Sequence, residues 1–386
     1  MLGAALLGTV GPRPIYKAMG WTPPPKRHRC AKVEVSTSHD IEGGVIMKIT
    51  TIGIDLAKDA FQVHGIDEHG KICVKRSLKR KEMMEFFTRT EPCLIGMESC
   101  SGAHYWARRL RDVGHTVKLM APQFVKPYVK GNKHDAADAE AICEAVRRPT
   151  MRFVPIKTVD QQSILAVHRV RQGMIKARTA QANQIRGLLA EFGLIVPVGI
   201  SHLFLKVPTM LDEAKDTIPG VFRELIHRLL EHMKELTRQV DQLEIQIHQW
   251  HRASEVSRNL EQIPGVGPIT ASALVASIGD ARNFKNGRQL AAWLGLVPKQ
   301  HSSGGKTRLQ GISKRGDSYL RTLLVHGARA VVKSAERKPE QHVWLSKLMD
   351  RSHNNIATVA QANKNARVIW ALMAHEQKFR SDYVRT

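Results

Sequence analysis

The feature that most constrains the fold of this sequence is a short apolar stretch, Thr-Ile-Gly-Ile-Asp-Leu-Ala at residues 51–57. It reads as a strand whose one carboxylate, Asp55, stands where the strand should end, and a buried carboxylate needs a cation or a proton beside it. A second apolar stretch, residues 93–98, again closes on an acid, Glu98. Asp135 and Asp138 are three residues apart, so they share one face of a helix. We therefore expect four acids to meet at one edge of a sheet.

Four carboxylates in one place would repel one another and raise one another's pKa. A divalent cation removes this conflict, and hard oxygen ligands select Mg²⁺ or Mn²⁺ rather than zinc. Two such ions about 4 Å apart would hold the attacking and leaving oxygens of a phosphodiester. Asp55, Glu98, Asp135 and Asp138 are thus the candidate catalytic residues and metal ligands. Each acid alone is more often a surface residue or a helix cap, and Asp59 competes with Asp55 from the turn after the strand.

The order of the elements around these acids indicates an α/β architecture. Three strands form a meander, helices and strands then alternate, and such an order predicts a mixed sheet in a layered fold. With an Asp and a Glu on strands and Asp-x-x-Asp on a helix, the pattern resembles the ribonuclease H-like fold, in particular the RuvC-type Holliday-junction resolvases. The expected strands are residues 48–56, 61–66, 72–78, 93–98 and 116–120, with a turn at 67–70; the expected helices are residues 79–88, 103–113 and 134–146.

The charge of the chain points to a polyanionic partner. Its 386 residues contain 59 Lys and Arg against 35 Asp and Glu, a net charge of +24. Such an excess most often indicates nucleic acid, although a generically basic protein is an alternative. No run of about 18 apolar residues exists to span a membrane. The five cysteines form no C-x-x-C pair, which argues against a zinc ribbon or disulfide scaffold and suggests a reducing, cytoplasmic compartment.

Residues 1–46 are expected to be a disordered extension without a catalytic role. They include the stretch Trp-Thr-Pro-Pro-Pro-Lys-Arg-His-Arg at residues 21–29, which is typical of a linker. No basic residue precedes Arg13, so the mildly apolar start is a poor signal peptide. Met47 directly precedes the first strand, and we expect it to be the natural start.

The middle of the chain, residues 151–255, reads as helical. Residues 158–192 form a helical pattern whose basic flank could lie along phosphates or be only a solvated face. Residues 193–206 break the pattern, and a second long helix follows Pro219. This helix has apolar residues at alternating spacings of four and three, which predicts a coiled coil, either as a hairpin on the first helix or as a dimer. The seam is Leu229, Met233, Leu236, Val240, Leu243, Ile247 and Trp250.

A glycine turn opens the C-terminal unit, residues 256–386, which we expect to be mostly α-helical. Ile-Pro-Gly-Val-Gly-Pro, residues 263–268, lies between two helical runs and resembles a helix-hairpin-helix element. The backbone N–H groups at Gly265 and Gly267, with the N-terminus of the following helix, could hold a phosphate. An ordinary interhelical turn is the alternative.

A serine loop follows at residues 298–308. Ser303 precedes two glycines, so a phosphodiester could approach it, and nearby cations could neutralise the charge that develops during attack. A plain loop is the alternative for this weak signal. Gly-Gly-Lys-Thr at residues 304–307 lacks the upstream glycine of an NTPase phosphate loop, so an ATPase is excluded. The flanking cations are Lys306, Arg308, Lys314, Arg315 and Arg321.

Taken together, these motifs resemble the DEDD transposases of the IS110 family of bacterial insertion sequences. The resemblance rests on the four acids, on the 263–268 turn, on Leu-Gly-Leu-Val-Pro at 294–298, on Ser-Ser-Gly-Gly-Lys at 302–306 and on Ile-Ser-Lys-Arg-Gly-Asp at 312–317. It extends from about Met47 to His375 and is closest to the IS1111 subgroup.

The resemblance implies a RuvC-like catalytic domain at residues 47–150, a coiled-coil middle and a C-terminal transposase domain. It implies Mg²⁺ held by the four acids and a serine, best matched by Ser303 although Ser302 is adjacent, that forms a covalent phosphoserine with DNA. It further implies a homo-oligomer, a dimer or a tetramer, in which the acids and the serine meet between subunits. A structured guide RNA would pair with the element ends and the target DNA, at the nucleoid of a bacterial cytoplasm.

Three functions remain distinguishable from the sequence. The first is a transposase or recombinase that cuts and rejoins DNA through the serine, with metal ions or, less directly, His301 activating the hydroxyl. The second is a hydrolytic, structure-selective endonuclease of the RuvC type, which would need the four acids but not Ser303. The third is an inactive nucleic-acid-binding relative, against which the intact acids argue.

Overall fold

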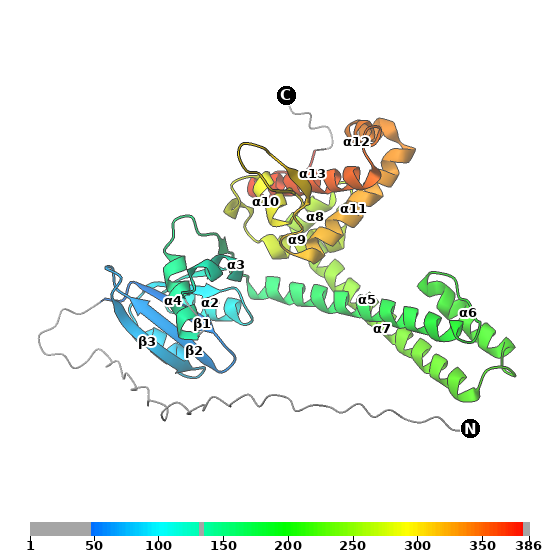
Figure 1. Ribbon diagram of the computed structural model, residues 1–386, viewed down its shortest axis with the longest axis horizontal. Coiled ribbons are helices and arrows are strands. Elements are labelled where there is room, and N and C mark those ends of the chain that lie inside the picture. The colour runs from blue at the N-terminus through cyan, green and yellow to red at the C-terminus, as the bar shows by residue number, and fades with distance from the viewer. Residues whose placement is uncertain (1–47, 131–134, 381–386) are drawn as a thin grey trace, which may run out of the picture. The chain divides into compact units, whose positions relative to one another are not determined.

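The computed structural model describes residues 48–130 and 135–380, and Figure 1 shows their helices and strands. The extension expected at residues 1–46, and Met47 with it, lies outside the described residues. Among the helices of the described residues, none combines the length and apolar character needed to cross a membrane. The four cysteines within these residues are free thiols, as expected for a chain without a disulfide scaffold.

The N-terminal part is a mixed α/β unit built on one six-stranded sheet, consistent with a ribonuclease H-like fold. The strand order is β3-β2-β1-β4-β5-β6, in which β1, β4 and β5 are parallel and β2, β3 and β6 run antiparallel to their neighbours. The predicted meander and the next two strands are confirmed. The strands are β1 (Thr51–Leu56), β2 (Ala60–Ile66), β3 (Ile72–Lys79), β4 (Leu94–Glu98), β5 (Thr116–Met120) and β6 (Phe153–Val154).

Local chemistry explains where these strands end. Asp67 closes the β2–β3 turn because its Oδ1 accepts hydrogen bonds from the backbone N–H groups of His69 and Lys71, at 2.9 and 2.8 Å. β3 continues to Lys79, which pairs with Ala60, so the helix predicted from residue 79 begins only at residue 83. The sequence did not predict β6, which is two residues long and extends the sheet past residue 150.

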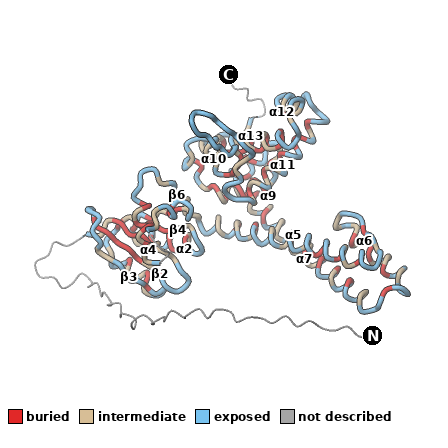
Figure 2. Tube along the Cα trace, viewed as in Figure 1, coloured by how far each residue is buried: buried red, intermediate tan, exposed pale blue. Residues whose placement is uncertain are grey.

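One face of the sheet packs against α1 (Met83–Arg89) and α2 (Ala103–Asp112). The core between them contains Ile52, Ile54 and Met97, which are fully buried, and Figure 2 shows the buried strands in red. Phe61 of β2 meets Trp106 of α2 edge-on, with the ring centroids 5.3 Å apart. Burial of these large apolar side chains supplies the main stabilisation of this layer.

The other face carries α4 (Asp135–Val146), which lies unusually close to the strands. An added Cβ at Gly53 would stand 2.2 Å from the carbonyl oxygen of Ala139, and one at Gly96 would stand 2.8 Å from the Cβ of Val146. Both positions therefore require glycine, which lets the backbone of α4 rest almost directly on β1 and β4. The short α3 (Pro122–Val125) and the 3-10 turn η1 (Lys126–Tyr128) lead into this layer.

The middle of the chain is a helical hairpin of α5 (Val159–Ala190) and α7 (Gly220–Ala253). Thr158 and Gln161 form a capping box that fixes the start of α5. The apolar seam of α7 is buried within the chain, since Met233 packs with Ile185 of α5, and Ile247 with Ile164. The seam is therefore already used in an intrachain hairpin, and dimerisation through it stays a prediction.

Residues 193–206 were expected to break the helical pattern, but only the first half of this stretch does so. After Gly193 and Gly199, both with positive φ, the helix α6 (Ile200–Glu213) begins. It buries Leu203, Val207 and Leu211, four residues apart, against the hairpin. Pro208 inside the helix is a residue that normally ends one, and it concealed this spacing in the sequence.

The C-terminal part is helical around one apolar core that includes Leu260, Leu274, Leu290, Leu320 and Ile369. The sequence did not predict its one β-hairpin, because both strands are exposed and show no apolar alternation. The elements are α8 (Glu255–Glu261), α9 (Pro268–Ile278), η2 (Ala281–Asn283), α10 (Gly287–Trp293), β7 (Pro298–Gln300), β8 (Leu309–Ile312), α11 (Ser318–Arg337), η3 (Pro339–His342), α12 (Val343–Met349) and α13 (Asn354–Ala374).

A buried polar network connects α5 with α9 and α11. His168 Nδ1 lies 3.0 Å from the Tyr319 hydroxyl, and its Nε2 lies 3.1 Å from the Ser272 hydroxyl. Ser272 donates to the carbonyl of Pro268, so His168 Nε2–H donates to Ser272 and Tyr319 donates to Nδ1. Burial lowers the pKa of His168 to about 4, so the ring is neutral and every member of the network is satisfied.

The close contact of α4 with the sheet yields the first prediction. Gly53→Ala should lower the free energy of unfolding by about 3 kcal/mol, because the added methyl group overlaps the α4 backbone. The measurement is urea denaturation followed by tryptophan fluorescence.

Gly173→Ala, inside α5, is the matched control. No atom lies within 4 Å of its added Cβ, so this change should instead stabilise by about 0.5–1 kcal/mol. Equal effects of the two substitutions would contradict the assigned role of Gly53.

Candidate active site

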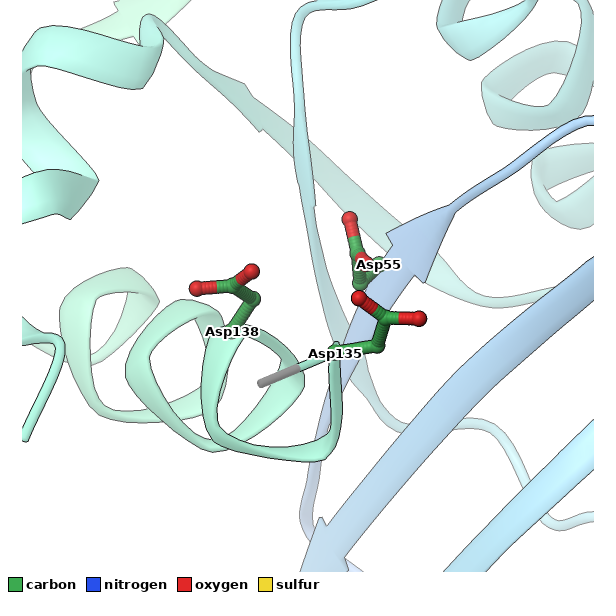
Figure 3. A group of neighbouring side chains, drawn as sticks. All are labelled: Asp55, Asp135 and Asp138. Carbon is green, nitrogen blue, oxygen red and sulfur yellow. The ribbon is translucent and has the colours of Figure 1, made fainter. Parts of the chain in front are cut away.

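Three of the four predicted acids meet in the structure. Asp55, Asp135 and Asp138 each offer a carboxylate oxygen, and these oxygens all lie within 4.8 Å of one another. Figure 3 shows Asp55 rising from β1 towards the first turn of α4, which carries the other two. Asp55 and Asp138 are half-buried and Asp135 is exposed. Among the His, Cys, Asp and Glu side chains of residues 48–130 and 135–380, this is the one group arranged closely enough to share an ion.

The sheet register explains why Asp55 belongs here and where Glu98 lies. Gly53 pairs with Gly96 and Ile54 with Met97, so Asp55 and Glu98 follow the last pair on two neighbouring parallel strands. Adjacent strands are about 4.8 Å apart, and side chains alternate between faces. Asp55 and Glu98 therefore share the face of Gly53 and Gly96, on which α4 lies.

Glu98 is a neighbour of the three aspartates rather than a member of their close group. The pKa of the Cys100 thiol is raised first by burial and then by the negative charges of Glu98 and Asp55, so both carboxylates lie near that sulfur. The structure thus places all four acids at one edge of the sheet but brings only three within 4.8 Å. Asp59, the competing acid, is exposed and outside this group.

The helix supplies part of the electrostatics of the group. Asp135 and Asp138 occupy the first turn of α4, where the helix dipole favours negative charge. This offsets some of the repulsion among the aspartates but supplies no cation. Three converging carboxylates with solvent access suit a hard divalent ion that keeps some of its waters. The arrangement can therefore hold Mg²⁺ or Mn²⁺, while Glu98 is placed to bind through the same edge.

Ser303 lies at the tip of the β7–β8 hairpin, where it pairs with Lys306. The two residues between them, Gly304 and Gly305, have φ values of 55° and 76°, the positive pair that a type I′ turn requires. Ser303 is exposed, and the two following residues have no side chains. A large substrate can therefore reach its hydroxyl.

The two adjacent serines differ in their hydrogen bonding. The Ser302 hydroxyl accepts a hydrogen bond from Gln300 Nε2 at 2.9 Å. For Ser303 no side-chain hydrogen bond occurs within the described residues. His301 is exposed beside them, and its backbone N–H donates to Arg308 across the hairpin.

The predicted cations near the serine separate into two groups. Lys306, Arg308, Lys314 and Arg315 are exposed. Arg321 is instead structural in this chain, since its Nη1 donates to the carbonyls of Leu294 and Arg315, at 3.2 and 3.0 Å. It therefore stabilises the base of the hairpin through one of its nitrogens, and a contact of Arg321 with nucleic acid through its other N–H groups stays a prediction.

Sequence reasoning missed the glycines that form this base. Gly295 has φ 74°, and an added Cβ would stand 2.1 Å from the carbonyl oxygen of Arg315; Gly316 has φ 80°, and its Cβ would stand 2.0 Å from that of Trp293. The two segments are thus in backbone contact. Both glycines stand in the quoted motifs of residues 294–298 and 312–317, which was the available signal.

The glycine turn has a similar packing role. Gly265 has φ 84°, and its added Cβ would stand 2.6 Å from the carbonyl oxygen of Gly327 in α11. Gly265 is therefore explained by close contact between this turn and α11. Gly267 caps α9, is exposed and has no atom within 4 Å of its Cβ position. A phosphate contact at this turn stays a prediction, and Gly267 is the more accessible of the two.

Comparison with known proteins gives matches over both regions. A transposase model named DEDD_Tnp_IS110 matches residues 52–193, which contain the acids. The model described as the Transposase IS116/IS110/IS902 family matches residues 257–343, which contain the serine hairpin.

Related sequences match nearly the whole of their own length. A probable family 20 transposase of Pseudomonas aeruginosa is 51% identical over 86% of this chain and 99% of its own length. The transposase for insertion sequence element IS1328 of Yersinia enterocolitica is 41% identical over 84% of this chain and 96% of its own. That for IS1111A of Coxiella burnetii is 41% identical, over 86% and 92%.

The aspartate group yields a prediction about metal binding. Asp138→Asn should weaken Mn²⁺ binding by about 10-fold or more, because it removes one of the converging negative ligands. Electron paramagnetic resonance of free Mn²⁺ during titration measures this directly. Asp112→Asn, an exposed acid of α2, removes the same charge elsewhere and should leave the affinity unchanged. Equal losses in both variants would show that only overall charge matters.

The hairpin base yields a second prediction. Arg321→Ala should destabilise the hairpin by about 2 kcal/mol, because two carbonyls lose a charged donor. Limited trypsin digestion should then cut faster after Lys306 or Arg308, as followed by mass spectrometry. Arg329→Ala, an exposed residue of α11, is the control and should not change the rate. An unchanged cleavage rate in Arg321→Ala would show that Arg321 does not stabilise the base of the hairpin.

Proposed function

The chain belongs to the IS116/IS110/IS902 family of transposases, which process DNA, and from that premise we propose the chemistry by which it does so. Divalent cations at the acidic group and a nucleophilic serine would together cut and rejoin the strands of a bacterial insertion sequence. The observation that carries this proposal is the convergence of Asp55, Asp135 and Asp138 within 4.8 Å.

In this proposal the acids position the cleaved phosphate. Asp55, Asp135 and Asp138 hold Mg²⁺ or Mn²⁺, and Glu98 binds from the neighbouring strand end. The ions would supply Lewis-acid polarisation of the phosphoryl oxygens. The chain itself contributes rigidity, because β1, β4 and α4 carry the carboxylates and Gly53 and Gly96 allow these elements to pack closely.

Ser303 is the proposed nucleophile. Its Oγ forms a bond to phosphorus while the bond from phosphorus to one strand-end oxygen breaks, and the serine proton ends on that leaving hydroxyl. The resulting phosphoserine keeps the energy of a phosphodiester, so a second strand-end hydroxyl can reverse the step without ATP. The exposure of Ser303, and the engagement of Ser302 with Gln300, support this choice. Lys306 and Arg308 would neutralise charge on the phosphate.

The proposed partners are DNA, both the element ends and the target, and a structured guide RNA. The net charge of +24 supports contact with long polyanions. We further propose a homo-oligomer in which the serine of one subunit reaches the acids of another. The acids lie before residue 139 and the serine at residue 303, on separate parts of the chain.

Replacing the serine distinguishes transposition from hydrolysis. Ser303→Ala should abolish the covalent protein–DNA adduct, which is measured as a slowly migrating band of end-labelled element DNA on denaturing gels. Ser302→Ala is the matched control and should retain the adduct.

Replacing an acid tests the other half of the proposal. Asp135→Asn should reduce all cutting by about 100-fold or more, because one oxygen at the ions loses its charge. If Ser303→Ala still cuts without an adduct, the protein is a hydrolytic endonuclease of the RuvC type. If Asp135→Asn cuts normally, the acidic group is not the catalytic site.

A further inference from the structure

A polar pocket lies on the α4 face of the sheet, next to the acidic group. It has a volume of about 500 Å³, and its lining comes from β2 and β3, including His64 and Ile72, and from α4, including Glu140 and Arg147. His64 pairs with Gly53, two residues along the strand from Asp55. The pocket and the three aspartates are thus neighbouring parts of one surface between α4 and the sheet.

His64 is a buried histidine with no partner. Its side chain is only 3% exposed, and Nδ1 is fully buried without a hydrogen bond. Nε2 likewise has no hydrogen bond within the described residues, yet it is not closed off from solvent as Nδ1 is, so it is the nitrogen that faces the pocket. A buried polar group of this kind costs stability unless a partner satisfies it.

Burial, more than the charges around it, keeps the ring of His64 neutral by lowering its pKa. Burial lowers the pKa of His64, the ammonium groups of Lys75 and Lys130 lower it further, and Glu140 opposes them. A neutral ring carries one proton. With Nδ1 buried and without a hydrogen bond, the proton is best placed on Nε2, where it can be donated to an oxygen entering the pocket.

The cations of the pocket exceed its acids. Lys130 lies 3.5 Å from Glu140 and 3.3 Å from Glu144, and Arg148 pairs with Glu144. Arg147 is exposed and has no acidic partner in the part of the chain that the structure describes. One guanidinium therefore remains for an anion, and its planar fork suits a phosphate.

The position of Arg147 relates the pocket to the acids. It follows Asp138 by nine residues, so the two are about 13 Å apart along the helix axis. A separation of this size is spanned by a few nucleotides of a strand. A strand with one phosphate at the acids can therefore place another phosphate here.

We propose that the pocket binds a backbone phosphate of the nucleic-acid strand held at the acidic group, with His64 Nε2–H and the Arg147 guanidinium as donors. This rests on the proposed function only in taking a phosphodiester strand as the ligand of the acids. It assigns to the β2–α4 surface a role in orienting the strand and no part in the chemistry.

Nuclear magnetic resonance of the full chain with ¹³C-labelled histidines tests the contact. The His64 Cε1–H signal, assigned through its absence in His64→Gln, should shift on titration with a 12-nucleotide single-stranded DNA at micromolar concentration in EDTA. Inorganic phosphate at equal ionic strength should shift it only at concentrations at least 100-fold higher. A signal unmoved by DNA overturns the proposal, as does an equal response to micromolar phosphate, which would indicate a small-anion site.

Arg147→Gln supplies the second measurement. It should weaken binding of the same DNA about 5-fold and reduce the salt dependence of log K by about 0.7, the change expected for one phosphate contact on a single strand. Arg111→Gln, an exposed position at the end of α2 on the other face, should leave both values unchanged.

Equal losses of DNA affinity in Arg147→Gln and Arg111→Gln would mean that the affinity depends only on overall charge. That result would overturn the proposed phosphate contact in the pocket. Because these titrations contain no divalent metal, they report binding alone. If the binding results are as expected but no serine adduct forms, the phosphate-binding proposal stands and the proposed role of Ser303 fails.

Discussion

The structure of the candidate site depends on a single packing contact, that of α4 on the glycines of two central strands. Gly53 and Gly96 remove the side chains that would otherwise separate the helix from the sheet. The first turn of α4 consequently lies over the strand ends, where Asp55 and Glu98 emerge. Without a cation, the acids repel one another and this repulsion costs stability. The apolar core on the opposite face of the sheet stabilises the layer that carries them.

In the C-terminal part, glycines likewise allow close backbone contact, here at the base of the β7–β8 hairpin. Gly295 and Gly316 allow two backbone segments to touch, and Arg321 bridges their carbonyls. These contacts fix the base of the hairpin. Ser303 lies at its two-glycine tip and is exposed. At both the acids and the serine, glycines thus set the backbone geometry that positions the candidate side chains.

Much of this was predictable from the sequence, for physical reasons. Apolar strands that end on an acid mark Asp55 and Glu98, with Asp59 as a competitor of Asp55, and a helix with Asp-x-x-Asp marks the other pair. Hydrophobic periodicity does not report contacts between distant backbones, so the packing roles of Gly53 and Gly96 were not visible. It also does not report exposed strands, which is why β7 and β8 were missed, and a proline concealed the short apolar spacing of α6. Composition also cannot show that a cation such as Arg321 bonds carbonyls of its own chain, while its contact with nucleic acid stays a prediction.

The buried polar groups show a further limit of sequence reasoning. His168 and His64 are both isolated histidines in the sequence, yet one is fully satisfied by Tyr319 and Ser272 and the other faces a pocket without a partner. Only the positions of their neighbours separate a structural role from a binding role. The same distinction applies to the aspartates, whose individual positions say little until three of them converge.

The most direct test of this account is anomalous X-ray diffraction from crystals of the full chain soaked in Mn²⁺. The account predicts an anomalous peak within about 2–2.5 Å of oxygens from Asp55, Asp135 and Asp138, the distance range of oxygen ligands around hard divalent ions. Carboxylates that stay in place around empty density at saturating Mn²⁺ would contradict it.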